Sequence, residues 1–198
     1  MSMLRAFIAL ELPGGLQKVI SQVIERLQAK AGKTSVRWVP AANIHLTLKF
    51  LGDVAPTGLG LIEEAMMSEA SLHNDIRMEA GGLGAFPNLK RPRVIWMGVD
   101  APPELASLQH GIDSATARLG YASESRSFSP HLTLGRVREN ASSSELSVIT
   151  SALQEVKFTS PEPFVGDAVH LFKSDLQPSG SVYTRLFSAP FSSKKKKE

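Results

Sequence analysis

The chain has 198 residues and no cysteine, and 42% of its residues are hydrophobic and 21% charged, which is ordinary for a globular protein. The lack of cysteine excludes disulfides, thiolate chemistry and cysteine-ligated zinc. The formal charge of +3 comes from four Lys and one Glu at the C-terminal end, because the other basic and acidic residues cancel (22 − 4 against 19 − 1). Any affinity for nucleic acid must therefore come from a local basic patch.

The length suits a single domain of two small lobes, which we place at residues 1–191. Residues 192–198 form a Lys-rich run that we expect to be a disordered tail, since like charges repel and bury nothing. No apolar run approaches the roughly 18 residues that span a bilayer, and the first apolar segment lacks the basic start and the cleavage site of a signal peptide. We expect a cytoplasmic protein with no membrane partner.

In chain order, the first half reads as strands interleaved with two helices. Apolar spacings of three and four predict helices over 16–31 and 57–72. Short apolar segments bounded by Gly or Pro predict strands over 4–12, 35–39, 45–51 and 76–84.

The second half repeats this order after a loop over 86–92. Helices are expected over 103–119 and 142–153, the second with a Ser-rich start suited to capping. Strands are expected over 94–99, 128–137, 165–172 and 182–187. Strands and helices that mix without strict alternation favour an α+β fold with antiparallel sheets.

One four-residue string, His-Leu-Thr-Leu, occurs twice, beginning at His45 and again 86 residues later at His131. Alternation along a strand places each His and the Thr two residues later, Thr47 or Thr133, on one face, with leucines behind them. Two such strands facing each other across a cleft offer two imidazoles and two hydroxyls to one small ligand. We expect the nearest imidazole nitrogens to lie roughly 5–9 Å apart, with room for a phosphate between them.

This set of side chains suits phosphodiester cleavage. One imidazole can take a proton from the attacking water while the other donates a proton to the leaving oxygen, and the unperturbed imidazole pKa of about 6.5 suits both roles. The two threonines can hydrogen-bond the non-bridging phosphate oxygens. The chemistry needs no metal and no other cofactor. A metal site built from the histidines is disfavoured, because no Asp or Glu lies within either string.

Longer segments around both strings resemble the 2H phosphoesterases, and in particular the RNA 2′,3′-cyclic phosphodiesterases, also called 2′-5′ RNA ligases. The similarity runs over nearly the whole chain, and the segments that carry it are residues 5–9, 37–40, 43–52, 92–98, 128–136 and 171–174, with Tyr183. The resemblance implies a two-lobed α+β fold with a pseudo-twofold axis, in which antiparallel sheets with flanking helices surround a central cleft.

The resemblance also implies hydrolysis of an RNA 2′,3′-cyclic phosphate to a 2′-phosphomonoester, with reversible 2′-5′ ligation as a further activity. It implies that His45 is the proton donor and His131 the proton acceptor, whereas the symmetric strings themselves do not assign the roles. The expected partner is an RNA end, tRNA-like or an oligonucleotide, bound by a monomer. Two alternatives remain open. The first is a 2H phosphodiesterase with another substrate, which is a small cyclic nucleotide, ADP-ribose cyclic phosphate or a 2′-5′ oligonucleotide. The second is an RNA-end binding module without activity.

Two further residues are candidates for substrate binding. Lys49 shares the face of His45 in a regular strand, so it either neutralises phosphate or is a solvated lysine. Arg5 shares a face of the first strand with Phe7. Arg136 points away from His131 in regular geometry, which favours a structural or rim role.

Overall fold

The computed structural model describes residues 2–32, 34–158, 162–177 and 180–192, and within these ranges it is an α+β fold. None of its helices is long and apolar enough to cross a membrane. The helices are α1 (Gly14–Ala31), α2 (Leu59–Ala70), α3 (Pro103–Arg118) and α4 (Ser143–Glu155), with short 3-10 turns η1 (Ala41–Asn43) and η2 (Pro56–Gly58). The strands are β1 (Leu4–Leu10), β2 (Val36–Trp38), β3 (Leu46–Val54), β4 (Ile76–Phe86), β5 (Val94–Asp100), β6 (His131–Val137), β7 (Phe164–Gly166), β8 (Ala168–Gln177) and β9 (Gly180–Pro190).

The strands form one antiparallel sheet in the order β7-β4-β5-β6-β3-β1-β8-β9, with β2 paired to β6. The order is symmetric about the junction of β3 and β6: β1 lies beside β3 as β5 lies beside β6. At that junction the register holds a single residue pair, Leu46 with Leu132. The sheet is thus two half-sheets joined at the residues that follow the two histidines.

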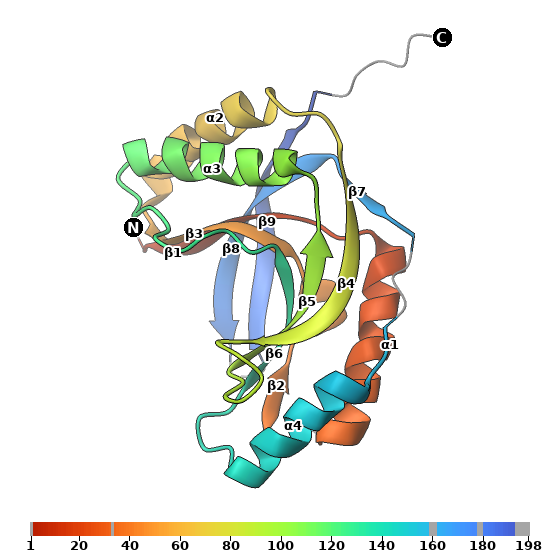
Figure 1. Cartoon of the computed structure of the whole chain (residues 1–198). Helices are drawn as coiled ribbons and strands as arrows, with labels where there is room; N and C mark the ends of the chain where they lie inside the picture. The colour runs from red at the N-terminus through yellow and green to blue at the C-terminus, as the bar shows by residue number, and fades with distance from the viewer. Residues whose placement is uncertain (1, 33, 159–161, 178–179, 193–198) are drawn as a thin grey trace.

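Each half of the chain contributes one helix to each of two helix pairs. Helix α1 packs with α4 at one end of the sheet, and α2 packs with α3 at the other (Figure 1). Residues of all four helices join one continuous core with the strand residues that point toward them, such as Ile8, Leu46 and Leu132, which are fully buried. We call this side of the sheet the helix face. The side that carries His45, Thr47, His131 and Thr133 is the histidine face.

Extra residues interrupt the alternation of both central strands. In β3, Ala9 pairs with Thr47 and Ile8 with Lys49, so Leu48 is left without a partner on β1. Such a β-bulge shifts the residues beyond it to the other face. Lys49 therefore points to the helix face, and the prediction that it shares the face of His45 was wrong.

The same interruption occurs in β6. Trp96 pairs with Thr133 and Ile95 with Gly135, which leaves Leu134 as the extra residue. Arg136 consequently lies on the histidine face, whereas the next residue, the buried Val137, points to the helix face. The prediction that Arg136 points away from His131 was wrong for the same reason.

Several boundaries also differ from the sequence predictions. Strand β4 continues to Phe86, and β8 and β9 form a hairpin longer than the segments expected over 165–172 and 182–187. Backbone pairing holds the polar part of this hairpin together, and a hydrophobic pattern cannot reveal such pairing. Ser192, which we assigned to the tail, donates hydrogen bonds to Ser71 and His73 carbonyls. The rest of the predicted tail, residues 193–198, lies outside the described residues.

Candidate active site

The pairing of Leu46 with Leu132 brings the two His-x-Thr pairs together. In an antiparallel pair, the residue before one partner lies beside the residue after the other, so His45 neighbours Thr133 and His131 neighbours Thr47. The two leucines are fully buried on the helix face, whereas the four polar residues are half-buried on the opposite face. Two imidazoles and two hydroxyls thus form one cluster at the centre of the sheet.

Both imidazoles are held by the same local hydrogen bond. The Nδ1 atom of His45 lies 3.0 Å from the carbonyl oxygen of Asn43, and Nδ1 of His131 lies 2.7 Å from that of Ser129. A carbonyl oxygen can only accept, so each Nδ1 carries the hydrogen. This leaves each Nε2 as the atom available for proton transfer. It accepts a proton when the ring is neutral and donates one when the ring is charged.

Aromatic rings enclose His45. Phe7 stacks on the imidazole with ring centroids 4.5 Å apart, and Tyr183 meets it edge-on at 5.2 Å. Burial in this apolar surround disfavours the imidazolium and lowers the pKa of His45 to about 4, against a smaller opposing effect of the Asn43 carbonyl. His45 is therefore neutral at pH 7 in the protein without substrate.

His131 has a more open surround. The ring of Phe86 meets it edge-on at 4.9 Å, and Phe86 in turn lies 5.3 Å from Trp96. Trp96 occupies the histidine face directly opposite Thr133, and the absence of a side chain at Gly84 leaves the space that its indole fills. The two histidines, alike in sequence and in backbone contact, thus differ in their surroundings.

A cavity of about 320 Å³ opens beside His45 rather than between the two histidines. Its size is at the lower end of the range for small-ligand sites, roughly 300–1,000 Å³. Polar groups at its wall include the ion pair between Arg185 and Glu11, 2.9 Å apart. Its lining residues are Glu11, Leu12, Gln17, Ala42, Asn43, Ile44, His45, Phe172, Tyr183 and Arg185.

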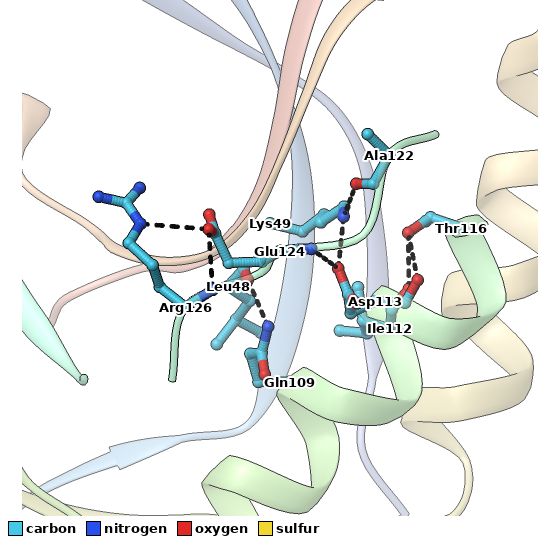
Figure 2. Close-up of polar contacts among 9 residues, drawn as sticks. All are labelled: Leu48, Lys49, Gln109, Ile112, Asp113, Thr116, Ala122, Glu124 and Arg126. Atoms are coloured by element: carbon cyan, nitrogen blue, oxygen red, sulfur yellow. Dashed lines mark hydrogen bonds and ion pairs between the residues drawn. The ribbon is translucent and has the colours of Figure 1, made fainter. Parts of the chain in front are cut away.

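Figure 2 shows where Lys49 goes instead of the site. Its ammonium donates to the carboxylate of Asp113 on α3 and to the carbonyl of Ala122. Burial by itself would raise the pKa of Asp113, but the hydrogen bonds from Lys49 and from the Glu124 backbone hold that pKa below its ordinary value. Gln109 of α3 reaches the carbonyl of the extra residue Leu48, at 3.4 Å. Lys49 therefore fastens β3 to α3 and to the segment that leads to His131.

The other sequence candidates lie at different distances from the cluster along the strands. Arg5 is exposed and, by alternation along β1, on the histidine face with Phe7. The bulges add two residues to that face that alternation had placed elsewhere: Arg136, and Phe50, which is 64% exposed and has its ring 6.2 Å from that of Phe7. No sequence signal marks these bulges, because the extra residue in each is an ordinary strand leucine.

Comparison with known proteins identifies the family. The model of the family described as LigT like phosphoesterase matches the chain twice, over residues 10–96 and 98–183, and each match contains one His-Leu-Thr-Leu string. The chain belongs to this family. The resemblance stated from the sequence is thereby confirmed.

Relatives called RNA 2′,3′-cyclic phosphodiesterase match the chain over nearly its full length. One from Methanothermobacter thermautotrophicus is 34% identical over 92% of this chain and 96% of its own. One from Archaeoglobus fulgidus is 32% identical over 92% of this chain and 98% of its own.

Solved structures agree with the fold. LigT of E. coli in complex with 3′-AMP has a TM-score of 0.67 and 26% identity, covering 96% of this chain and 99% of that one. The protein TT0787 of Thermus thermophilus has a TM-score of 0.77 at 23% identity, covering 96% and 99%, and bears on the fold alone. The predicted α+β fold of the 2H phosphoesterases is confirmed.

Proposed function

We propose that this LigT-like phosphoesterase hydrolyses the 2′,3′-cyclic phosphate at the end of an RNA to a 2′-phosphomonoester. The observation that carries the proposal is the cluster of two His-x-Thr pairs, each histidine with Nδ1 bound to a carbonyl and Nε2 left for proton transfer. The name that the relatives from M. thermautotrophicus and A. fulgidus bear supports the same substrate.

The ring opening requires one base and one acid on opposite sides of phosphorus. Nε2 of His131 accepts a proton from water as its oxygen attacks phosphorus, and the bond from phosphorus to O3′ breaks. Nε2 of His45 donates its proton to O3′, which leaves as a hydroxyl. The product is a 2′-phosphomonoester with a free 3′-hydroxyl.

The cavity beside His45 supports this division of roles. The leaving O3′ belongs to the ribose, so the terminal nucleoside must lie on the side of the proton donor. The structure has a cavity of about 320 Å³ at His45, lined by Asn43, Tyr183 and Arg185 among others. Its aromatic and hydrogen-bonding groups suit a nucleoside.

A proton donor with a pKa of about 4 must gain its proton when the substrate binds. An anionic phosphate about 4 Å from the imidazole contributes about 4 kcal/mol at the effective dielectric constant of a protein surface. That energy equals about three pKa units, which returns His45 to the neutral range where general acids work well. The phosphate of the substrate thus stabilises the protonated form of His45 that donates the proton.

Thr47, Thr133 and Arg136 are placed to stabilise the negative charge of the phosphate. The hydroxyls of Thr47 and Thr133 donate to the non-bridging oxygens, and the guanidinium of Arg136, farther along β6, adds positive charge to the same face. The proposed reaction routes no step through a metal. Within the described part of the chain, no three His, Asp or Glu side chains are grouped as metal ligands.

The product of a short RNA that ends in a 2′,3′-cyclic phosphate tests the proposal. We expect a 2′-phosphomonoester, identified by phosphorus NMR, in the presence of excess chelator. His45→Ala and His131→Ala should form this product far more slowly than the wild type. A 3′-phosphomonoester, or an unchanged RNA that binds tightly, would contradict the proposal; the second result favours an RNA-end binding module. Mononucleoside cyclic phosphates, ADP-ribose cyclic phosphate and 2′-5′ oligonucleotides in the same assay rank the alternative substrates, and reaction of 2′,3′-cyclic and 5′-hydroxyl ends tests for ligation.

A further inference from the structure

Basic side chains gather at one end of the sheet, although the charges of residues 1–193 sum to zero. Three segments meet there: β2 with its flanking Ser35, the loop and start of β5 over 87–94, and the end of β6 over 135–139 (Figure 1). They contain six basic residues and one acidic residue, a net charge of +5. We call this cluster the basic end; its members are Arg37, Lys90, Arg91, Arg93, Arg136 and Arg138.

Backbone pairing fixes this arrangement. Arg37 of β2 lies directly opposite Arg136 of β6, which in turn lies opposite Val94. The Val137 N–H donates to the Arg93 carbonyl at 2.9 Å, and the Arg138 N–H donates to the Ser35 carbonyl at 2.9 Å. A groove lined by Arg93, Val94, Arg136, Val137 and Glu139 runs between these strands. The basic side chains are therefore carried by strands and by the hairpin loop between β4 and β5.

The six basic side chains have no ion-pair partner among the described residues, although two carboxylates lie in or beside the cluster: Glu139 lines its groove, and Glu145 accepts a hydrogen bond from the Ser35 hydroxyl. All six basic side chains are exposed. Like charges directly opposite each other on paired strands, as at Arg37 and Arg136, destabilise a sheet. A sheet that retains such a pair, without a carboxylate between the two, is suited to an anion bound from outside.

The basic end is continuous with the catalytic cluster. Directly opposite residues share a face, so Arg37 joins Arg136 on the histidine face. From β2 the chain runs beside β6, with the Val39 N–H bonded to the Leu134 carbonyl at 2.8 Å, and then through η1 to His45. The basic end thus lies beside the segment that leads into His45, on the His45 side of the catalytic cluster. The proposed reaction places the terminal nucleoside on this same side.

We propose that the basic end binds the sugar–phosphate backbone of single-stranded RNA upstream of the terminal cyclic phosphate. This inference rests on the proposed function for the orientation of the RNA. The phosphates of a flexible strand carry negative charge at regular intervals, whatever the base sequence. Exposed arginines on a rigid surface can therefore bind the strand without reading its sequence. The surface supplies the local patch that a body of zero net charge requires for nucleic-acid affinity.

The test compares two substrates in one triple variant, Arg37→Gln, Arg91→Gln and Arg138→Gln, which keeps long side chains and leaves Arg136 in place. For an oligonucleotide ending in a 2′,3′-cyclic phosphate, we expect KM to rise about ten-fold or more at low salt, with kcat unchanged. The slope of log KM against log salt should shrink by roughly 2, at about 0.7 per phosphate contact on a single strand. For a mononucleoside 2′,3′-cyclic phosphate, which has no upstream backbone, kcat and KM should stay as in the wild type.

A matched control removes charge elsewhere. The double variant Lys18→Gln with Arg26→Gln removes two exposed positive charges from α1, which packs against the helix face. It should leave kcat and KM unchanged for both substrates. Equal losses on both substrates in the triple variant, or no loss on the oligonucleotide, would overturn the proposal.

A binding measurement separates this inference from the proposed reaction. Fluorescence anisotropy with a labelled single-stranded RNA ending in a 3′-hydroxyl needs no turnover. We expect salt-dependent binding by the wild type and by His131→Ala, weakened in the triple variant. If that pattern holds while no cyclic phosphate is opened, the proposed function fails and the basic end stands. Wild-type affinity in the triple variant, or a preference for double-stranded RNA that the variant retains, removes the basic end as the binding surface.

Discussion

Leu46 and Leu132 lie directly opposite each other at the only point where the register joins β3 to β6, and both are fully buried. Each follows a histidine and precedes a threonine. One hydrophobic contact on the helix face therefore sets the positions of four polar side chains on the other face. It also explains why the two halves of the chain, each with one His-x-Thr pair, make a single site.

The first prediction concerns the threonine hydroxyls. Thr47→Val and Thr133→Val should keep the fold, since valine suits a strand, but should raise KM and lower kcat on a cyclic phosphate. The loss should be smaller than for either His→Ala variant, because neither hydroxyl transfers the reacting proton. Thr184→Val, on the exposed outer strand β9, is the matched control. Unchanged steady-state kinetics in both site variants would remove the hydroxyls from the phosphate site.

The second prediction concerns Lys49, whose buried ion pair with Asp113 is a structural contact. Removing one partner of a buried pair leaves an uncompensated charge and costs about 3–5 kcal/mol. Lys49→Met should therefore lower the free energy of unfolding in urea by about that amount. KM should remain near the wild-type value at temperatures where the variant is folded, since the side chain points away from the histidine face.

The control for Lys49 is Lys30→Met, which breaks the exposed pair with Glu155. Exposed pairs contribute about 0–1 kcal/mol, so this variant should be nearly as stable as the wild type. A Lys49→Met protein of wild-type stability with a strongly raised KM would return Lys49 to the substrate site.

The sequence was sufficient to predict the fold class and both His-x-Thr pairs, because a repeated string on two strands carries its own geometry. It was not sufficient for the faces of Lys49 and Arg136. Alternation assumes regular strands, and the extra leucines at 48 and 134 are indistinguishable from their neighbours in hydropathy. Asp113, 64 residues from Lys49, gives no sign in the sequence that it will bind that lysine. The basic end was likewise hidden, since it combines short segments separated along the chain.

The surroundings of His45 show a similar limit. The sequence places Phe7 on one face of β1, but the contribution of Tyr183 depends on how β8 and β9 pair beside that strand. The lowered pKa of His45 follows from this enclosure. Two identical strings therefore gave symmetric roles in the sequence, and only tertiary packing distinguishes them.

The third prediction is that His45 takes up a proton when a cyclic phosphate binds. With a pKa of about 4, His45 is neutral in the free protein between pH 6 and 7, and the phosphate anion raises that pKa. A group whose pKa rises on binding takes up protons at pH values between its two pKa values. Calorimetry in buffers of different ionisation enthalpy measures this uptake.

His131→Ala is the suitable protein for calorimetry, because it should bind a nucleoside 2′,3′-cyclic phosphate without turning it over. We expect uptake approaching one proton near pH 6, and the phosphodiester itself does not titrate there. His45→Ala with His131→Ala should bind with no comparable uptake. Binding by His131→Ala without proton uptake would mean that His45 stays neutral beside the phosphate, and it would reverse the proposed roles.

The last prediction separates the roles of the two histidines by the leaving group. His45→Ala and His131→Ala should each lose about 10²–10⁴-fold in kcat, and the double variant should lose little more because the pair acts as a unit. Replacing the bridging O3′ by sulfur makes a leaving group that departs as a thiolate and needs no proton. If His45 is the donor, this substrate should largely restore the rate of His45→Ala. It should not restore His131→Ala, which still lacks the base that activates water. Equal restoration of both variants, or restoration of His131→Ala alone, would contradict the assignment, and wild-type rates in either single variant would exclude the two-histidine mechanism.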